Sequence, residues 1–102
     1  MRSLRVTAKY MREGEEVIIV TRGQTAKSLL ALVEAYPKGV TAQEVSSWAL
    51  RFAAYCHDLI HKHGLSIRTD REQHEGGWHG RHVLETPVEI TEVVRPERKE
   101  AA

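Results

Sequence analysis

Residues 41–64, TAQEVSSWALRFAAYCHDLIHKHG, carry the signals that decide the fold. Thr41 followed by Glu44 is the pattern of a capping box, in which each side chain accepts a hydrogen bond from the other residue's backbone amide. Ser46 and Ser47 then offer a second N-cap, because a serine hydroxyl satisfies amides that the first turn of a helix leaves unpaired. The stretch therefore predicts a short helix, a tight turn and the start of a second helix.

The second helix is predicted over residues 48–63. Its small and apolar residues recur with the i, i+3, i+4 spacing of one buried stripe: Ala49, Phe52, Ala53, Cys56, Leu59 and Ile60. Gly64 suits the left-handed backbone conformation just after a helix C-terminus. Two helices of unequal length across so short a turn form a helix-turn-helix, whose second helix enters the major groove in nucleic-acid binders.

An N-terminal β-hairpin is predicted before this motif. Residues 4–10 alternate between apolar and polar side chains, as in a half-buried strand, and residues 17–20 are a run of β-branched residues. Thr25 suits the N-cap of a helix that ends near Tyr36, because Pro37 cannot continue it.

A second β-hairpin is predicted after the motif. Alternation resumes at Leu65, residues 73–80 (QHEGGWHG) form a glycine-rich tip, and another strand follows Pro87. We therefore expect an α+β protein in three parts: an N-terminal β-hairpin and connector (1–24), a domain of three helices and a β-hairpin (25–94), and a polar C-terminal tail (95–102).

Composition narrows the class of protein. The chain has 102 residues, enough for one domain, and a net charge of +1, so it has no global basic field. No apolar run approaches the roughly 20 residues that cross a bilayer. Cys56 is the single cysteine and cannot form an internal disulfide. We expect a cytoplasmic protein with no membrane partner.

Two segments resemble a known family. Residues 51–69, RFAAYCHDLIHKHGLSIRT, and residues 76–84, GGWHGRHVL, are similar to small bacterial and phage winged helix-turn-helix proteins. In that group the third helix runs from an Arg-apolar-Ala-Ala pattern to Asp-Leu, ends in glycine and leads into a strand that carries Ile and Thr. The resemblance covers about residues 25–85. It implies a winged helix-turn-helix fold, to which the N-terminal β-hairpin is an addition.

For function, the resemblance implies double-stranded DNA binding by a regulator of transcription. Helix 48–63 would enter the major groove, and a wing at residues 70–81 would contact the backbone or the minor groove. Arg51 matches the family's basic position early in the helix. The chain departs from the family at Tyr55, where a second basic residue is common, and at His82, where the return strand often has an aromatic residue.

The residue types themselves also fit contact with DNA. With the apolar stripe buried, the helix turns outward Trp48, Arg51, Tyr55, Asp58 and Lys62. An arginine can donate to both O6 and N7 of guanine, and a serine at a helix N-terminus can hold a phosphate. Two arginines flank the glycine-rich tip, which can approach a sugar-phosphate backbone closely. The candidate DNA-binding residues are Ser47, Trp48, Arg51, Tyr55, Lys62, Arg71 and Arg81.

A protein-interaction module without DNA binding is the alternative. Residues 41–85 hold five Lys or Arg against six Asp or Glu, and the neutralisation of phosphates is the main source of non-specific affinity. An exposed patch of Trp48, Leu50 and Tyr55 would favour a protein partner. The N-terminal hairpin could also pair its edge with a second chain, and such a homodimer would place two helices on spaced half-sites.

Metal and catalytic chemistry have less support. His57 and His61 are spaced i, i+4 and could ligate one metal, and protonated histidines near pH 6 could strengthen DNA binding. The simpler interpretation is that both face solvent, that His63 lies at the helix end and that His82 fills a core position. The sequence has no nucleophile elbow and no phosphate loop. We expect no catalytic residue, no metal site and no cofactor.

Overall fold

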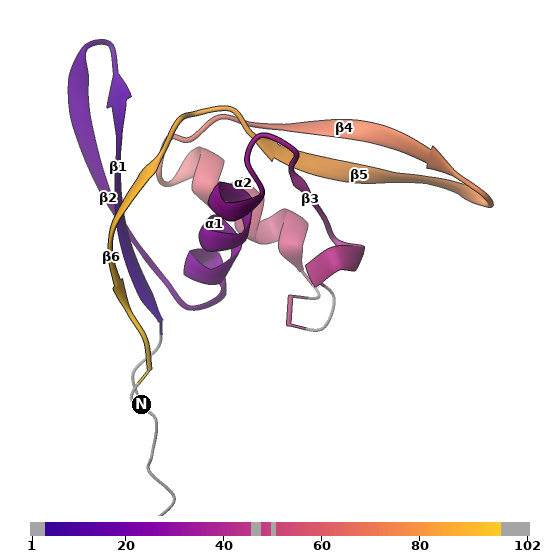
Figure 1. Ribbon diagram of the computed structural model, residues 1–102, viewed down its shortest axis with the longest axis horizontal. Coiled ribbons are helices and arrows are strands. Elements are labelled where there is room, and N and C mark those ends of the chain that lie inside the picture. The colour runs from indigo at the N-terminus through magenta and orange to yellow at the C-terminus, as the bar shows by residue number, and fades with distance from the viewer. Residues whose placement is uncertain (1–3, 46–47, 50, 97–102) are drawn as a thin grey trace, which may run out of the picture.

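The computed structural model describes residues 4–45, 48–49 and 51–96. Its elements follow the order β1 (Arg5–Arg12), β2 (Glu15–Arg22), α1 (Gly23–Ala35), β3 (Val40–Thr41), the 3-10 turn η1 (Gln43–Val45), α2 (Phe52–His61), β4 (Ile67–His74), β5 (Gly77–Leu84) and β6 (Glu89–Val94) (Figure 1). The strands form two sheets, with the orders β2-β1-β6 and β3-β5-β4.

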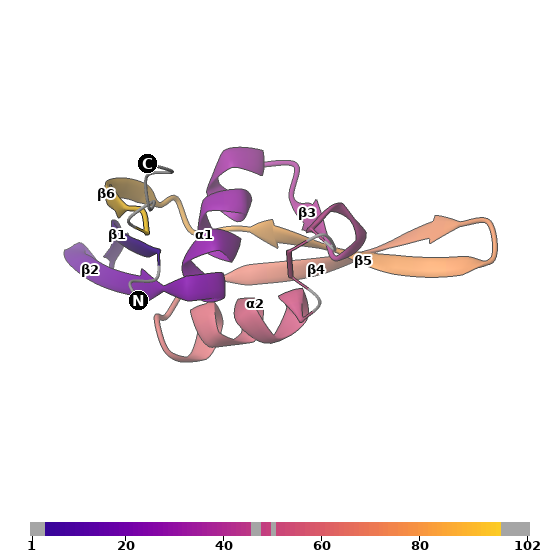
Figure 2. The same cartoon turned by 90° about the horizontal axis from the view of Figure 1, so that it is seen from below.

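The two helices lie between the two sheets. The N-terminal sheet stands on one side of the helices, and the β4–β5 hairpin projects from the other side (Figure 1). Viewed at a right angle, this hairpin extends far beyond both helices (Figure 2). The molecule measures 47 × 44 × 19 Å. No helix in the described part of the chain is long and apolar enough to cross a membrane.

The N-terminal hairpin forms as the alternation predicts, and it gains a third strand. Glu13 and Gly14 join β1 to β2 with positive φ angles of 50° and 81°, the conformation of a type I′ turn, which matches the twist of the strands. The strand that follows Pro87 becomes β6 and pairs antiparallel with β1, Arg5 opposite Val94. Alternation indicated a strand there but not its partner, because the pattern of one strand does not specify its neighbour.

The expected third helix is not found in the described residues, which contain two α-helices. The capping box is confirmed: the Thr41 amide donates to Glu44 Oε1 at 2.9 Å, and the Glu44 amide donates to Thr41 Oγ1 at 3.2 Å. It begins only the single 3-10 turn η1, Gln43–Val45. The amides of Trp48 and Ala49 both donate to the Val45 carbonyl. The predicted serine caps, Ser46 and Ser47, lie outside the described residues.

Both helix starts differ from the prediction. Helix α2 spans Phe52–His61 rather than 48–63, because Arg51 has non-helical angles (φ −117°, ψ 42°) at its N-cap. Helix α1 begins at Gly23, before the expected cap Thr25. The Gly23 amide donates to the Leu4 carbonyl at 2.8 Å. The last backbone hydrogen bond of the N-terminal hairpin therefore comes from the first residue of α1.

One hydrophobic core joins the two sheets through the helices. Helix α1 contacts both strands of the N-terminal hairpin, β5 and α2. The largest fully buried apolar side chains come from α1, α2, β5 and β1: Leu29, Leu32, Phe52, Leu59, Leu84 and Val6. Cys56 is also buried, and this burial raises the pKa of its thiol to about 12.

The C-terminal end of α2 is hydrogen-bonded to the N-terminal hairpin. Gly64 has the expected positive φ of 76°, and its amide donates to the Ile60 carbonyl at 3.1 Å, which completes an αL cap. The Tyr10 hydroxyl donates to the His63 carbonyl at 2.8 Å, and Arg12 Nη2 donates to the Gly64 carbonyl at 3.2 Å. Two side chains of β1 therefore satisfy carbonyls that the helix end leaves unpaired.

We predict that Gly64→Ala destabilises the protein by about 2–3 kcal/mol. A Cβ at Gly64 would collide with the Arg12 guanidinium and the Tyr10 hydroxyl, in addition to the strain of the positive φ. Gly14→Ala is the matched control, since Gly14 has a similar φ of 81° and no described heavy atom within 4 Å of a Cβ. It should cost only about 1–2 kcal/mol. Equal destabilisation of the two variants in urea denaturation would contradict a role for the Arg12 and Tyr10 contacts.

We also predict that Cys56 is unreactive in the native protein. Since its thiol has a pKa of about 12 and is buried, almost no thiolate is present at about pH 8, where an ordinary cysteine is partly ionised. A thiol reagent that gives a coloured product should modify Cys56 only after denaturation. Rapid modification of the folded protein would show that this part of the core opens.

Candidate nucleic-acid interface

The order of elements places α2 against the base of the β4–β5 hairpin. Strand β3 pairs with β5, Val40 opposite His82, and β5 pairs with β4 along its whole length. The Phe52 ring at the start of α2 meets the His82 ring edge to face, with centroids 5.3 Å apart. Thr69 Oγ1 lies 3.1 Å from His82 Nδ1, so β4, β5 and α2 meet at one position.

The exposed side of α2 differs from the predicted one. Because Phe52, Cys56 and Leu59 are buried, the residues most exposed within the helix are Ala53, Ala54, His57 and His61. The His57 and His61 rings lie one turn apart, with centroids 4.1 Å from each other. This agrees with the simpler interpretation of both as surface residues. The center of the exposed face therefore carries small side chains and imidazoles.

The five candidate residues around this helix fall into different environments. Arg51 and Lys62 are exposed at its two ends, and Lys62 Nζ lies 3.7 Å from Asp58 Oδ1. Tyr55 is half-buried and packs against the core. Trp48 packs there too, with Lys27 Nζ 4.7 Å from its ring centroid. Ser47 lies outside the described residues.

The β4–β5 hairpin has two faces of different chemistry. A two-residue turn at Glu75 and Gly76 sets the register, in which Gln73 lies opposite Trp78 and Arg71 opposite Gly80. Side chains alternate along each strand, so these residues share the face on which His82 meets α2. We call this face, defined by Arg71, Gln73, Trp78 and Gly80, the α2-side face of the wing.

The α2-side face carries a cation stacked on an exposed aromatic ring. Arg71 Cζ lies 4.2 Å from the ring centroid of Trp78, a residue that is 53% exposed. Arg71 forms no ion pair with any residue that the structure describes. Its positive charge therefore remains available to an anionic partner, in a position held by the ring. Sequence reasoning missed Trp78, although the register of a two-residue turn would have placed it beside Arg71.

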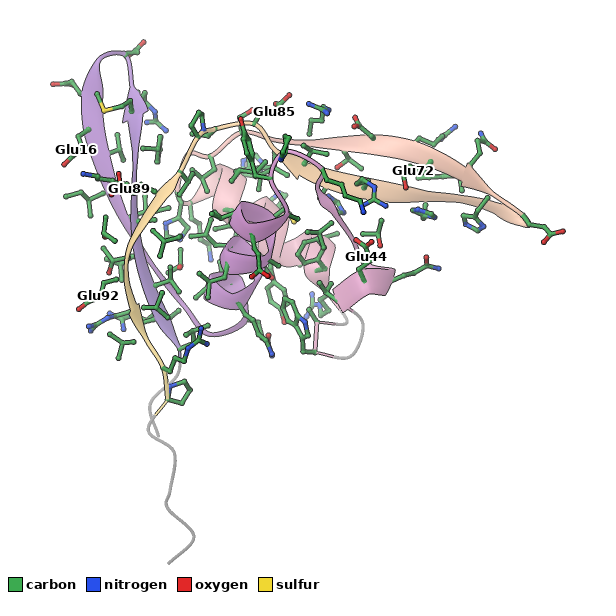
Figure 3. The ribbon with its side chains drawn as sticks, viewed as in Figure 1. Glu16, Glu44, Glu72, Glu85, Glu89 and Glu92 are labelled. Atoms are coloured by element: carbon green, nitrogen blue, oxygen red, sulfur yellow. The ribbon has the colours of Figure 1, made fainter. Side chains whose placement is uncertain are left out.

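The opposite face is a network of internal ion pairs. The Glu72 carboxylate accepts from Arg81 Nε at 2.7 Å and lies 2.9 Å from His79 Nε2. Hydrogen bonds from Arg81 and His79 hold the pKa of Glu72 below its usual value. Arg81 also donates to the Gly39 carbonyl at 3.1 Å and to Glu44 at 3.4 Å. Figure 3 shows Glu72 on the hairpin and Glu44 on the turn beside it.

Arg81 therefore has a structural position. Its side chain is only 15% exposed, and its guanidinium connects the hairpin to η1 and to the loop before β3. Arg68, on the same face, is likewise paired with Asp70 at 2.8 Å and Glu85 at 3.3 Å. Of the two arginines predicted to anchor the wing, the structure leaves Arg71 accessible and gives Arg81 internal partners.

The histidines do not gather into a metal site. No group of three His, Cys, Asp or Glu side chains in the described part of the chain is arranged to hold an ion. Burial lowers the pKa of His63 and of His82, so mild acid adds little charge at these two positions.

Comparison with known proteins supports the family that the topology indicates. No curated protein and no solved structure matches the chain. A family described as a winged helix domain matches residues 18–94, from within β2 to the last residue of β6. The order of α1, β3, η1, α2, β4 and β5 is the order of a helix-turn-helix followed by a wing. The chain belongs to this winged-helix domain family.

Proposed function

We propose that the protein is a non-enzymatic, cytoplasmic DNA-binding protein, a regulator of transcription of the bacterial or phage type. Helix α2 would enter the major groove, and the α2-side face of the wing would lie along the backbone or the minor groove. The observation that carries the proposal is the Arg71–Trp78 pair: an uncompensated cation on an exposed ring, on the same side of the wing as α2.

The pairing of the basic residues in 41–85 supports DNA binding more strongly than their number does. Of the five basic residues in 41–85, three are paired with carboxylates: Lys62, Arg68 and Arg81. Arg51 and Arg71 form no ion pair with a described residue. These two cations lie at the start of α2 and on the α2-side face of the wing. A few uncompensated cations would give modest, salt-sensitive affinity for duplex DNA.

The surface of α2 is compatible with a groove. Ala53 and Ala54 present little bulk, so the helix backbone could approach base edges closely. His57 and His61 present imidazoles, which can donate or accept hydrogen bonds. The helix would then supply base contacts, while Arg51 and Arg71 supply phosphate contacts that set its orientation.

A protein-interaction module remains the second candidate. Trp78 is the specific observation in its favour, because exposed tryptophans are common in protein interfaces. The patch expected on the helix face is reduced, since Trp48 and Tyr55 pack against the core and Leu50 lies outside the described residues. The homodimer expected through the N-terminal hairpin fits either function, and for DNA it would supply two recognition helices.

We predict that Arg71→Ala and Arg51→Ala each weaken duplex binding several-fold. Each should also lower the slope of the salt dependence by about one unit, because one phosphate is no longer neutralised. The measurement is fluorescence anisotropy with a labelled mixed-sequence duplex over a range of salt concentrations. Trp78→Ala should also weaken binding, because it removes the ring that positions Arg71.

Arg68→Ala is the matched control. Arg68 lies on the same strand as Arg71 and has the same charge, but it points to the opposite face and is paired with Asp70 and Glu85. Its removal should leave the affinity nearly unchanged. Equal weakening by Arg68→Ala and Arg71→Ala would contradict the proposed face of the wing. No binding by the wild type at low salt would contradict DNA binding itself and favour a protein partner.

A further inference from the structure

The outer edge of β2 has unpaired backbone groups. Strand β2 is an edge strand of the sheet β2-β1-β6. The Gly23 amide donates to the Leu4 carbonyl, and in an antiparallel pair every second residue bonds to the neighbouring strand. The backbone groups of the odd-numbered residues of β2 therefore bond to β1. The amides and carbonyls of the even-numbered residues therefore point away from the sheet. They belong to Glu16, Ile18, Val20 and Arg22.

This edge lacks the prolines and the irregular register of the opposite edge. Strand β6 follows Pro87 and precedes Pro96, its register with β1 is shifted at Thr7 and Ala8, and it carries Glu89 and Glu92. Prolines, irregular register and charges all discourage the pairing of edges. Strand β2 has an unbroken register with β1 over eight residues, with four β-branched residues at its center. Ile18 is 63% exposed and Val20 is 43% exposed.

A groove lies beside the same edge. It has a volume of about 430 Å³, and its walls are residues 17–20 of β2 and residues 61–64 at the end of α2, with Tyr10 and Arg12 between them. An added strand would occupy this groove, bond to the free groups of β2 and lie beside the end of α2.

We infer that the occupant is β2 of a second copy of the chain, paired antiparallel about a two-fold axis perpendicular to the sheet at Ile19. In this register Ile18 lies opposite the second copy's Val20, and Glu16 lies opposite the second copy's Arg22. Each of these pairs occurs twice. This register pairs even-numbered residues of one copy with even-numbered residues of the other. The helix-covered faces of the two N-terminal sheets therefore lie on the same side of the combined sheet.

The sequence of β2 favours a second copy over an unrelated strand. Read along the chain, EEVIIVTR is acidic, then apolar, then basic. An antiparallel copy therefore brings the acidic end to the basic end and the apolar centers together, which is the arrangement that an isologous interface requires. The result is one continuous sheet built from two three-stranded sheets. The inference specifies the dimer within the proposed function and does not depend on DNA binding.

Charge exchange on β2 tests this register. Sedimentation velocity of the full chain, over a wide range of protein concentrations, should show a dimer that dissociates on dilution. Glu16→Arg and Arg22→Glu each place like charges opposite one another twice, so each should weaken the dimer about tenfold or more. The double variant Glu16→Arg/Arg22→Glu restores opposite charges and should recover most of the wild-type affinity.

Glu92→Arg is the matched control at the protected edge. Glu92 is paired with Arg5 of β1 at 3.5 Å, just as Glu16 is paired with Lys9 of β1 at 3.6 Å. Both lie on the side of the N-terminal sheet away from the helices (Figure 3). Glu92→Arg should leave the dimer unchanged, and circular dichroism should confirm that every variant is folded.

Three results would overturn the inference: a wild type that is monomeric at every concentration, single variants that do not weaken the dimer, or a double variant that does not recover it. None of them bears on the DNA-binding experiment. A monomer that binds DNA would retain the proposed function without this dimer, and a dimer that fails to bind DNA would retain the dimer alone.

Discussion

Helix α1 is the element on which the rest of the structure depends. Ala26, Leu29 and Leu32 are fully buried, and the helix contacts the N-terminal hairpin, α2 and β5. Full burial of a leucine side chain contributes about 2 kcal/mol, so α1 supplies a large part of the free energy that holds the two sheets together. The winged-helix elements and the hairpin that precedes them therefore share one core, although the two sheets have no strand in common.

The sequence predicted features that depend on neighbouring residues. The alternation of β1, the capping box of Thr41 and Glu44, and the glycine cap at the end of α2 are all present. It did not predict features set by residues distant in the chain. Alternation indicated the strand that became β6 but not that its partner is β1. The start of α2 differs for a local reason, because Arg51 has non-helical angles at the N-cap.

The candidate site shows the same division. A run of alternating residues beside a glycine-rich turn predicts a β-hairpin with an arginine on each side of its tip, and the family resemblance implies that this hairpin is a wing. It could not distinguish Arg71 from Arg81, because that difference arises from Glu72 across the hairpin and Gly39 in a separate loop. The predicted stripe of α2 was also rotated, since Asp58 and Tyr55 lie nearer the core than His57 and His61. Such distinctions require the packing of the whole fold.

The length of the wing has a thermodynamic consequence. Strand β3 supports β5 only at Arg81 and His82, so the outer part of the hairpin is a two-stranded ribbon with no third strand beside it. A ribbon of this kind is marginally stable in water. Any partner that binds Arg71 and Trp78 must therefore restrict the motion of the ribbon, and this entropic cost offsets part of the favourable enthalpy of binding. The same contacts would therefore bind more tightly from a ribbon that is already ordered.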